Sequence, residues 1–283
     1  MAEEQSTKKR VKEKVEEVEM SFLEHLEVLR WHLIRAFASI FIFSILAFIN
    51  KDIIFDKIIM SPKMPDFWTN RMFAKLADFT GADSLRINTT ELKLISISMA
   101  GQFMTHIWTS IIAGVIIAAP YVIWEFWRFI KPALYDTERK HSVGAVFYMT
   151  FLFLTGVLFG YYLIVPLSVH FLGSYSISGE VANQINVLSY ISTVSSITIA
   201  SGVIFELPVF VYFLSKVGIL SPQLMKKYRR HAYVLLLIIS AIITPPDVFS
   251  QIMVCLPLVF LYEVGIIISK RVQKKANAAM NAA

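Results

Sequence analysis

Long apolar runs separated by short charged segments dominate the chain. Residues 94–124, 141–179 and 181–205 contain no Asp, Glu, Lys or Arg over 31, 39 and 25 positions respectively. A helix needs about 20 predominantly apolar residues to cross a hydrocarbon layer of roughly 30 Å. Because backbone polar groups in lipid must be satisfied internally, which a helix achieves within one segment, the pattern predicts a polytopic, all-α membrane protein.

Six segments have the length or the apolar character of membrane spans. We expect spans at residues 33–49, 107–127, 143–165, 191–214, 232–243 and 252–269. The fifth segment has only 12 residues, and these rise about 18 Å at 1.5 Å per residue. A helix of that length crosses only where the bilayer is locally thin or where the following turn lies below the membrane surface.

Composition and charge agree with a membrane protein. Apolar residues make up 56% of the chain, charged residues 17%, and the mean hydropathy is +0.60. A soluble domain carries about 25% charged residues, so a soluble globular protein is excluded. Lys and Arg outnumber Asp and Glu by 27 to 21, but they lie between the apolar runs, and we therefore expect no nucleic-acid partner.

The distribution of Lys and Arg predicts the orientation of the spans. If both ends of the chain lie in the cytosol, the inner segments hold nineteen basic residues. The outer segments then hold seven, all in the first outer loop, residues 50–106. Cytoplasmic loops carry such an excess, so we expect cytosolic N- and C-termini and an even number of spans.

The remaining segments surround a predicted membrane domain at residues 21–271. The first outer loop is long enough to have a structure of its own, and we expect helical pieces that cap the outer face. Residues 1–20, rich in Lys and Glu, and residues 272–283 are expected to be poorly ordered, solvated tails. The first apolar run follows 32 residues, of which 14 are Asp, Glu, Lys or Arg, without a cleavage pattern, and this argues against a cleavable signal peptide.

The local motifs of common catalytic and nucleotide-binding sites are missing. The chain has no Gly-rich phosphate loop, no His-Glu-x-x-His and no Gly-x-Ser-x-Gly. Its six histidines are scattered, and its one cysteine, Cys255, lies in an apolar run. We therefore expect no metal, no cofactor, no catalytic residues and no enzymatic activity.

Three acidic residues lie within the apolar runs: Glu125, Glu206 and Glu263. An ionisable side chain inside the membrane costs at least about 2.5 kcal/mol, so such residues are functional candidates. Glu206 lies mid-span beside Pro208, which can bend the helix and free backbone acceptors. We expect Glu206 to face a water-filled or partner-lined cavity rather than to be a neutral, hydrogen-bonded acid. For Glu125 and Glu263, an interfacial and a functional role remain open.

Two further motifs concern contacts between helices. Thr244-Pro245-Pro246-Asp247 ends the fifth span in a rigid turn, and Asp247 is placed to cap the sixth helix. Gln251 lies four residues further on the same helix face, so it can form a polar pair with Asp247 that points into the bundle. Gly156-x-x-x-Gly160 in the third span predicts a close helix approach.

Four segments together resemble the TatC family, the multispanning receptor subunit of the twin-arginine protein translocase. They are Phe22 to Leu26 (FLEHL) with Leu29-Arg30, Ile123 to Tyr135 (IWEFWRFIKPALY) with Glu138-Arg139, Gly202 to Pro208 (GVIFELP), and Thr244 to Gln251 (TPPDVFSQ). The resemblance follows the family order from residue 22 to about residue 270. It implies a concave, glove-like bundle of six transmembrane helices with short fifth and sixth helices, in the bacterial cytoplasmic (inner) membrane.

The resemblance implies a receptor for the twin-arginine signal peptides of folded cargo proteins. Such a receptor recruits single-span TatA/TatB-type subunits for export driven by the proton-motive force, and its other implied partners are further copies of itself and membrane lipid. Two guanidinium groups favour carboxylates in bidentate geometry, and the family's cytosolic glutamate after the second span falls on Glu138. The implied signal-peptide site comprises Glu27, Arg30, Phe129, Glu138 and Arg139.

A second implied site binds the partner helices. Glu206 falls on the family's mid-membrane glutamate, and the same surface is implied to include Thr244, Asp247 and Gln251.

The chain departs from the family pattern at one position of the signal-peptide site. His-Leu-x-Glu-Leu-Arg is replaced by His25-Leu26-Glu27-Val28-Leu29-Arg30, so Val28 stands in place of the family glutamate. Glu24 or Glu27 is a candidate for the missing charge, although one residue along a helix turns a side chain by about 100°. His32 stands at the usual basic position two residues beyond Arg30.

Two other classes of function remain open from the sequence. A proton-coupled solute transporter would use Glu206 as its proton site, but many such carriers are built from repeats, and we find no internal repeat. An intramembrane enzyme would draw on Ser195, Ser196 or His170, but no second residue at a supportive spacing singles any of them out.

Overall fold

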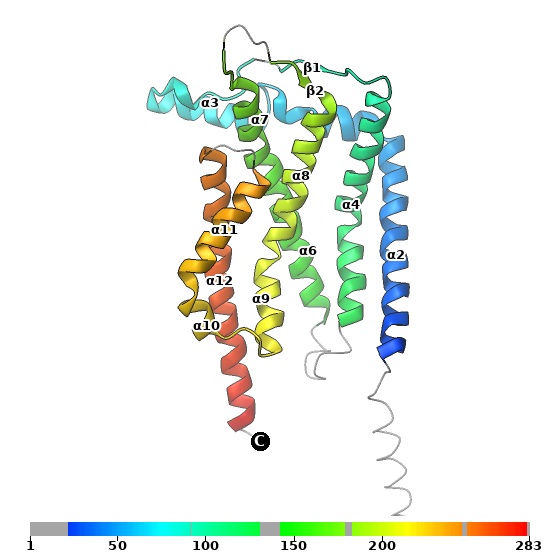
Figure 1. Ribbon diagram of the computed structural model, residues 1–283, viewed down its shortest axis with the longest axis vertical. Helices are drawn as coiled ribbons and strands as arrows, with labels where there is room; N and C mark the ends of the chain where they lie inside the picture. The colour runs from blue at the N-terminus through cyan, green and yellow to red at the C-terminus, as the bar shows by residue number, and fades with distance from the viewer. Residues whose placement is uncertain (1–21, 91, 131–141, 179–182, 245–247, 282–283) are drawn as a thin grey trace, which may run out of the picture.

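The computed structural model describes residues 22–90, 92–130, 142–178, 183–244 and 248–281. In this part of the chain, five helical stretches are long and apolar enough to cross a membrane: 26–49, 101–130, 144–174, 187–216 and 251–275. Helix α11 (Arg229–Ile243) lies beside them as the sixth member of the bundle (Figure 1). Its 15 residues rise about 22 Å, so the predicted short fifth helix is confirmed.

Several of these stretches are built from more than one element. The elements are α2 (Phe22–Ile49), α4 (Gly101–Ile130), α6 (Ser142–Phe159), η5 (Gly160–Ile164), α7 (Val165–Ser174), α8 (Val187–Phe205), α9 (Leu207–Lys216), α10 (Pro222–Lys227), α11 and α12 (Val248–Asn281). The third stretch joins α6, the π-helical η5 and α7, and the fourth joins α8 and α9.

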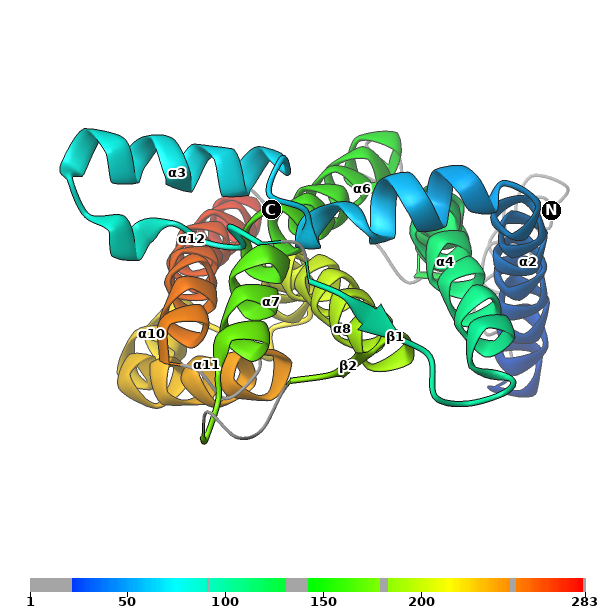
Figure 2. The ribbon, with the colours of Figure 1, turned by 90° about the horizontal axis from the view of Figure 1, so that it is seen from above.

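Viewed from above, the spanning helices form a curved row (Figure 2). α2 packs along α4, and α4 also contacts α6 and α8; α9 packs on α12, and α12 packs on α11. α2 and α11 lie toward opposite ends of the row, which is therefore open rather than closed into a ring. This arrangement agrees with the concave all-α bundle that the sequence predicts.

Small residues allow a close crossing of α6 and α8. A Cβ atom at Gly156 of α6 would lie 2.5 Å from the Ser201 carbonyl oxygen of α8 and 2.8 Å from Phe205 Cβ. A Cβ atom at Gly160 would lie 2.7 Å from Ser201 Oγ. Only glycine lets the two backbones approach this closely, so the predicted packing role of Gly156-x-x-x-Gly160 is confirmed.

The fourth stretch is interrupted at Glu206. Pro208 lies in the first turn of α9 and has no backbone N–H for an intrahelical bond. The Glu206 carbonyl instead accepts hydrogen bonds from the Val209 and Phe210 amides at 2.9 and 3.1 Å. The break therefore sets Glu206 at the junction of two helical segments, as the proline next to it suggested.

The sixth helix is longer than the sequence analysis predicts. A span at residues 252–269 and a poorly ordered tail from residue 272 were expected, but α12 continues as one helix from Val248 to Asn281 over 34 residues. Its last part is rich in Ala and Lys, which have high helix propensity, so the helix continues after the apolar stretch ends. The sixth helix therefore extends beyond the end of the expected span, whereas α11 is short.

The first outer loop carries structure of its own, as predicted. It contains the π-helical η1 (Asp52–Ile59), the 3-10 turns η2 (Ser61–Lys63) and η3 (Asp83–Leu85), the helix α3 (Trp68–Thr80) and the strand β1 (Leu94–Ile95). β1 pairs in parallel with β2 (Ile185–Asn186), with Leu94 opposite Ile185. We call this end of the bundle the cap face, and the opposite end, where α2 begins and α12 ends, the terminal face (Figure 1).

Polar contacts, two of them buried, hold the cap on the bundle. The hydroxyl groups of Tyr161 and Tyr190 donate to the η1 carbonyls of Ile58 and Ile59 at 2.7 and 2.8 Å. Asn88 Nδ2 donates to the Pro166 carbonyl at 2.9 Å. These bonds join the loop to the third and fourth spanning stretches.

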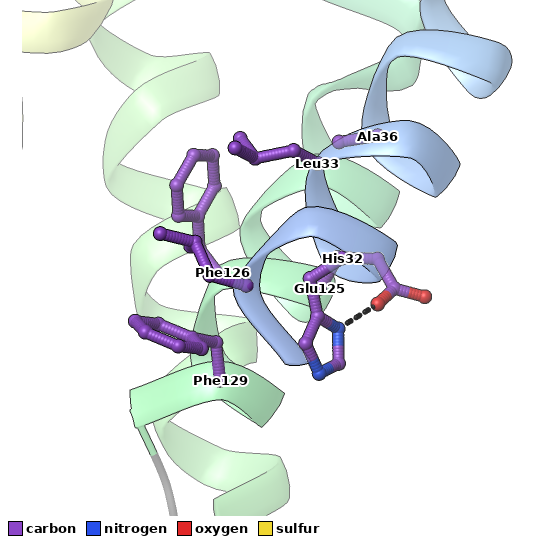
Figure 3. Close-up of a pocket in the computed structure, with 7 residues that line it drawn as sticks. His32, Leu33, Ala36, Glu125, Phe126 and Phe129 are labelled. Atoms are coloured by element: carbon purple, nitrogen blue, oxygen red, sulfur yellow. Dashed lines mark hydrogen bonds and ion pairs between the residues drawn. The ribbon is translucent and has the colours of Figure 1, made fainter. Parts of the chain in front are cut away.

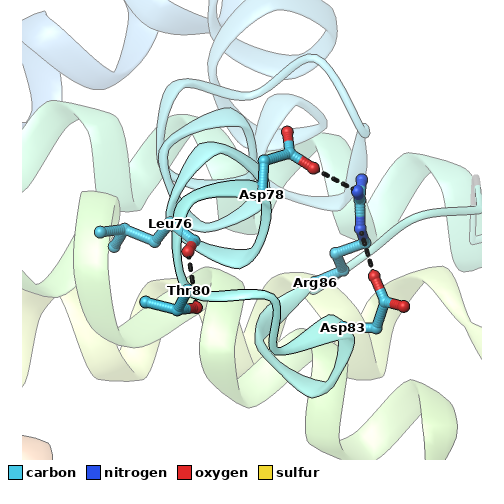
Figure 4. Close-up of polar contacts among 5 residues, drawn as sticks. All are labelled: Leu76, Asp78, Thr80, Asp83 and Arg86. Carbon is cyan, nitrogen blue, oxygen red and sulfur yellow. Dashed lines mark hydrogen bonds and ion pairs between the residues drawn. The ribbon is translucent and has the colours of Figure 1, made fainter.

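Arg86 forms two ion pairs within the first outer loop. Arg86 bonds Asp78 of α3 at 2.5 Å and Asp83 at 3.2 Å (Figure 4). Arg86 thus closes the turn that follows α3.

Candidate functional site

A small pocket opens between α2 and α4 near the terminal face (Figure 3). Its walls are residues of α2 and α4 that recur at helical spacing: Leu29, His32, Leu33 and Ala36 from α2, and Glu125, Phe126 and Phe129 from α4. Residues three or four positions apart lie on one face of a helix, so the long contact between α2 and α4 brings the two sets together.

Glu125 is the buried polar centre of this pocket, with a side chain only 1% exposed. His32 Nδ1 donates a hydrogen bond to Glu125 Oε2, and the Tyr121 hydroxyl donates to Oε1 at 2.9 Å. Arg128 Nη1 lies 3.9 Å from the same Oε1. A buried carboxylate is tolerated when several partners surround it, and these three partners meet that condition.

Aromatic rings line the same space. The Phe129 ring meets the His32 ring edge-on, with centroids 6.2 Å apart. The Arg128 guanidinium lies over the Trp124 ring at 4.7 Å from its centroid and is about half exposed. The pocket therefore combines a carboxylate, two phenyl rings and a neighbouring cation.

The sequence left the role of Glu125 open and missed its main partner. Tyr121 and Arg128 lie four and three residues from Glu125 and are visible as helix neighbours. His32 lies 93 residues away, and no local pattern links the two. The sequence did offer one indication of this contact, because His32 and Glu125 are polar residues at the corresponding ends of the first two predicted spans.

Of the residues predicted for signal-peptide binding, only some lie at the pocket. Phe129 lines the pocket, whereas Glu27 and Arg30 are exposed on α2 and are not among its lining residues. Val28 is half-buried and lies one helical turn before His32, hence on the same side of α2. Glu138 and Arg139 lie outside the described residues.

Glu206 lies at the junction of α8 and α9 with both carboxylate oxygens buried. Among the described residues neither oxygen has a hydrogen-bond partner. One turn earlier, Gly202 packs so closely on α6 that a Cβ atom there would lie 2.8 Å from Val157 and 2.9 Å from Phe153. Ser195 and Ser201 of α8 also carry buried hydroxyls without a partner in the described part of the chain, so α8 has several unsatisfied polar groups.

The other residues predicted for partner-helix binding lie where α11 and α12 meet. Thr244 is buried, and its hydroxyl donates to the Ser240 carbonyl at 2.8 Å. Gln251 Nε2 donates to the Leu237 carbonyl of α11 at 3.3 Å. Asp247 lies outside the described residues, so the predicted polar pair of Asp247 and Gln251 stays a prediction.

Glu263 has a different role from Glu125. It pairs with Arg229 at the start of α11 and accepts a hydrogen bond of 2.5 Å from the Tyr233 hydroxyl. Both partners belong to α11, so this cluster fastens the short helix to α12. The sequence left an interfacial and a functional role open for Glu263, and in the structure its charged partner is Arg229.

No group of three or more His, Cys, Asp or Glu side chains that could hold a metal ion occurs in the described residues. Together, the helical stretches and the buried polar groups between them define a multi-pass helical membrane protein. Its structured cap and its pocket lie at opposite ends of the bundle.

Comparisons with known proteins identify the family. Residues 24–257 match the family model described as Sec-independent protein translocase protein (TatC). The chain is 42% identical over 264 residues to the Sec-independent protein translocase protein TatC of Blattabacterium sp. subsp. Periplaneta americana (strain BPLAN), covering 93% of this chain and 99% of that relative. It is 30% identical over 258 residues to TatCy of Bacillus subtilis (strain 168), covering 91% and 92%.

A solved structure, the Crystal Structure of Twin Arginine Translocase Receptor- TatC in DDM, matches with a TM-score of 0.68 at 30% identity. The match covers 87% of this chain and 99% of that chain. The chain therefore belongs to the TatC family. It is a component of a Sec-independent protein translocase and not an enzyme.

Proposed function

We propose that this chain is the receptor of a twin-arginine translocase and that it binds the signal peptides of folded cargo at its terminal face. The observation that carries the proposal is the pocket between α2 and α4, which is lined by the buried Glu125 and by the rings of Phe126 and Phe129. A guanidinium group favours a carboxylate partner and also stacks on aromatic rings. A carboxylate and aromatic rings at one place are the groups that an arginine side chain binds, and we propose that one arginine of the peptide binds here.

The second arginine is assigned to Glu138, which lies ten residues after Arg128 and beyond the described part of α4. In this proposal Glu138 supplies the carboxylate for the second arginine, Arg30 and Arg139 limit how the peptide approaches, and Phe129 packs against the peptide. Glu27 is exposed on α2 and stays a candidate for a further contact.

Glu125 offers an explanation for the missing glutamate at position 28. Val28 lies one turn from His32, which holds Glu125 in place. A carboxylate from α4 therefore lies close to the side of α2 on which a glutamate at position 28 would project. In this proposal the Glu125 carboxylate supplies negative charge near the position that a glutamate at residue 28 would occupy.

Peptide crosslinking tests the assignment. Purified chain in lipid nanodiscs is mixed with a twin-arginine peptide that carries a photoreactive residue, and a twin-lysine peptide serves as the peptide control. Glu138→Lys is expected to abolish crosslinking while the bundle stays folded. Asp66→Lys, a matched charge reversal on the exposed cap face, is expected to leave it unchanged. Crosslinking that survives Glu138→Lys contradicts the site.

A second pair of variants tests whether the Glu125 carboxylate takes part in peptide binding. Glu125→Gln removes the pocket charge with little change of shape and is expected to weaken crosslinking at least tenfold. Val28→Glu in the same chain is expected to restore it. Loss that Val28→Glu does not rescue contradicts a charge role for Glu125.

The positive-inside excess supports an orientation with the terminal face in the cytosol. With the relatives being bacterial proteins, the proposed location is the cytoplasmic (inner) membrane with both termini in the cytosol.

Recruitment of single-span TatA/TatB-type subunits is assigned to a second surface. Glu206 offers two buried carboxylate oxygens without a partner among the described residues, and a polar side chain from a partner helix would satisfy them. Thr244 and Gln251 are assigned to the same surface, and Asp247, which lies outside the described residues, is proposed to belong to it as well. Further copies of the chain are expected in the same complex.

The alternative function is a proton-coupled solute transporter. The same buried Glu206 carboxyl group favours it, because such groups serve as proton sites in carriers. Uptake of a small solute by liposomes that hold the purified chain, under a pH gradient, would support this alternative. Without such uptake, the receptor is preferred.

A further inference from the structure

Helix α3 lies across the cap face, steeply inclined to the spanning helices (Figure 1). In the view from above it extends outward past α12 (Figure 2). Its residues divide into three faces. The buried face, which packs on the rest of the cap and on the bundle, comprises Thr69, Asn70, Phe73 and Ala77.

The exposed part of α3 is divided by chemistry. Apolar side chains at 100° per residue fall within an arc of about 80° and form a stripe of Trp68, Met72, Leu76 and Phe79. Trp68, Leu76 and Phe79 are 57%, 43% and 89% exposed. The charged residues Arg71, Lys75 and Asp78 lie together on the remaining side. α3 therefore has a stripe of large apolar side chains next to a charged row.

The apolar stripe continues onto a spanning segment. The Trp68 ring meets the Tyr162 ring edge-on, with centroids 6.1 Å apart. Tyr162 belongs to the third spanning stretch and is itself 39% exposed on its outer surface. The ring of Phe67, just before α3, stacks on the Tyr162 ring with centroids 5.4 Å apart. The stripe and the lipid-facing side of the third stretch thus form one continuous apolar surface with aromatic residues at its edge.

We propose that α3 is an interfacial helix whose apolar stripe lies in the lipid leaflet adjoining the cap face. Helices that lie in a membrane interface have this division into an apolar side and a charged side. Tryptophan and tyrosine are enriched at the level of the lipid headgroups. In this proposal the Trp68 and Tyr162 rings, which are in contact, lie at that level. The charged row on α3 then lies among the headgroups and water.

Lipid is the occupant that the surface favours over a protein partner. The stripe is continuous with the exposed surface of the third spanning stretch, which faces lipid in a membrane. A protein bound to the stripe would therefore have to displace lipid from that surface. Arg71 and Lys75 lie next to the stripe, and their positive charges are complementary to the negative charges of lipid phosphate groups.

The position of α3 also marks the membrane level at the outer end of α12. Phe73 of α3 packs in a cluster with Leu167, and Met253 of α12 lies against that cluster. Met253 lies within the second turn of α12. With α3 in the interface, the membrane surface lies close to the start of α12, which suits a bilayer that is thin next to the 15-residue α11.

Site-directed fluorescence tests the proposal in the full-length chain. Cys255 is the only cysteine, so Cys255→Ser gives a background for single-cysteine variants. Leu76→Cys and Phe79→Cys report on the stripe, and Arg71→Cys and Lys75→Cys are matched controls on the charged row of the same helix. Each variant is labelled with an environment-sensitive dye and reconstituted in vesicles at a low protein-to-lipid ratio.

Lipids that carry a nitroxide on the acyl chain are expected to quench the dye at residues 76 and 79 at least threefold more than at 71 and 75. Aqueous iodide is expected to give the opposite order. Equal iodide quenching at all four positions would place the stripe in water and overturn the proposal. Protection of residues 76 and 79 from both quenchers would show that protein, a second copy included, covers the stripe, and would also overturn it.

Discussion

Replacing His32 by alanine removes the main partner of a buried carboxylate. Glu125 is 1% exposed and is held by His32 Nδ1, by the Tyr121 hydroxyl at 2.9 Å and by Arg128 at 3.9 Å. We expect His32→Ala to lower the free energy of unfolding of the bundle. The reason is that a carboxylate stays buried while its strongest neighbour is lost.

The size of the effect follows from the partners that remain. Breaking a buried ion pair by removing one side costs about 3 to 5 kcal/mol. Because the Tyr121 hydroxyl and Arg128 stay near Glu125, we expect about 2 to 3 kcal/mol for His32→Ala. In a Glu125→Gln background the group left behind is a neutral amide, and the same change is expected to cost about 1 kcal/mol. The coupling between the two residues is then about 1 to 2 kcal/mol.

A double-mutant cycle measures this coupling. The four proteins are unfolded in mixed micelles with increasing SDS, and helix content is followed by circular dichroism. Arg30→Ala is the control, because Arg30 is exposed on the same helix and outside the pocket, and its effect is expected within about 0.5 kcal/mol. An equal cost of His32→Ala in both backgrounds would refute the reasoning that the pair stabilises the bundle.

Three further predictions concern other parts of the bundle. Gly156→Leu places a Cβ atom 2.5 Å from the Ser201 carbonyl oxygen, and we expect it to lower the free energy of unfolding by about 3 kcal/mol in the same SDS titration. Gly144→Leu is the control, because nothing lies within 4 Å of its Cβ position, and we expect it to be neutral. Similar values for the two variants would contradict the close crossing. Tyr190→Phe deletes a buried hydrogen bond to η1 and is expected to cost about 1 kcal/mol and to increase proteolysis of the first outer loop, and unchanged proteolysis would count against its role in holding the cap. Glu206→Leu is expected to leave signal-peptide crosslinking intact and to reduce co-purification of the single-span subunits; co-purification at the level of the unmodified chain would argue against the second surface.

The spanning helices follow from the sequence because their signal is length and apolarity, which are local. The break at Glu206 was also visible, since Pro208 stands two residues after it. The continuation of α12 to Asn281 was not, because a polar helix that leaves the membrane looks like a solvated tail when only hydropathy is considered. The fold could therefore be predicted in outline, with errors at the ends of helices.

The pocket could be predicted only in part. Phe129 was named through the family resemblance, and Glu125 was recognised as an unusual acidic residue in an apolar run. Its pairing with His32 depends on how α2 and α4 pack over a separation of 93 residues, and one sequence does not carry that information. Similarly, the apolar stripe of α3 follows from helical spacing only after the buried face of the helix is known.

The most direct test of the receptor function is to map where a signal peptide touches the chain. A photoreactive residue placed next to the two arginines of the peptide is activated in nanodiscs, and the crosslinked residues are identified by mass spectrometry. We expect crosslinks to the walls of the pocket, at Leu29, Phe126 and Phe129, and their loss with a twin-lysine peptide. Crosslinks that lie on the cap face or along α12, or that persist unchanged with the twin-lysine peptide, would contradict the account.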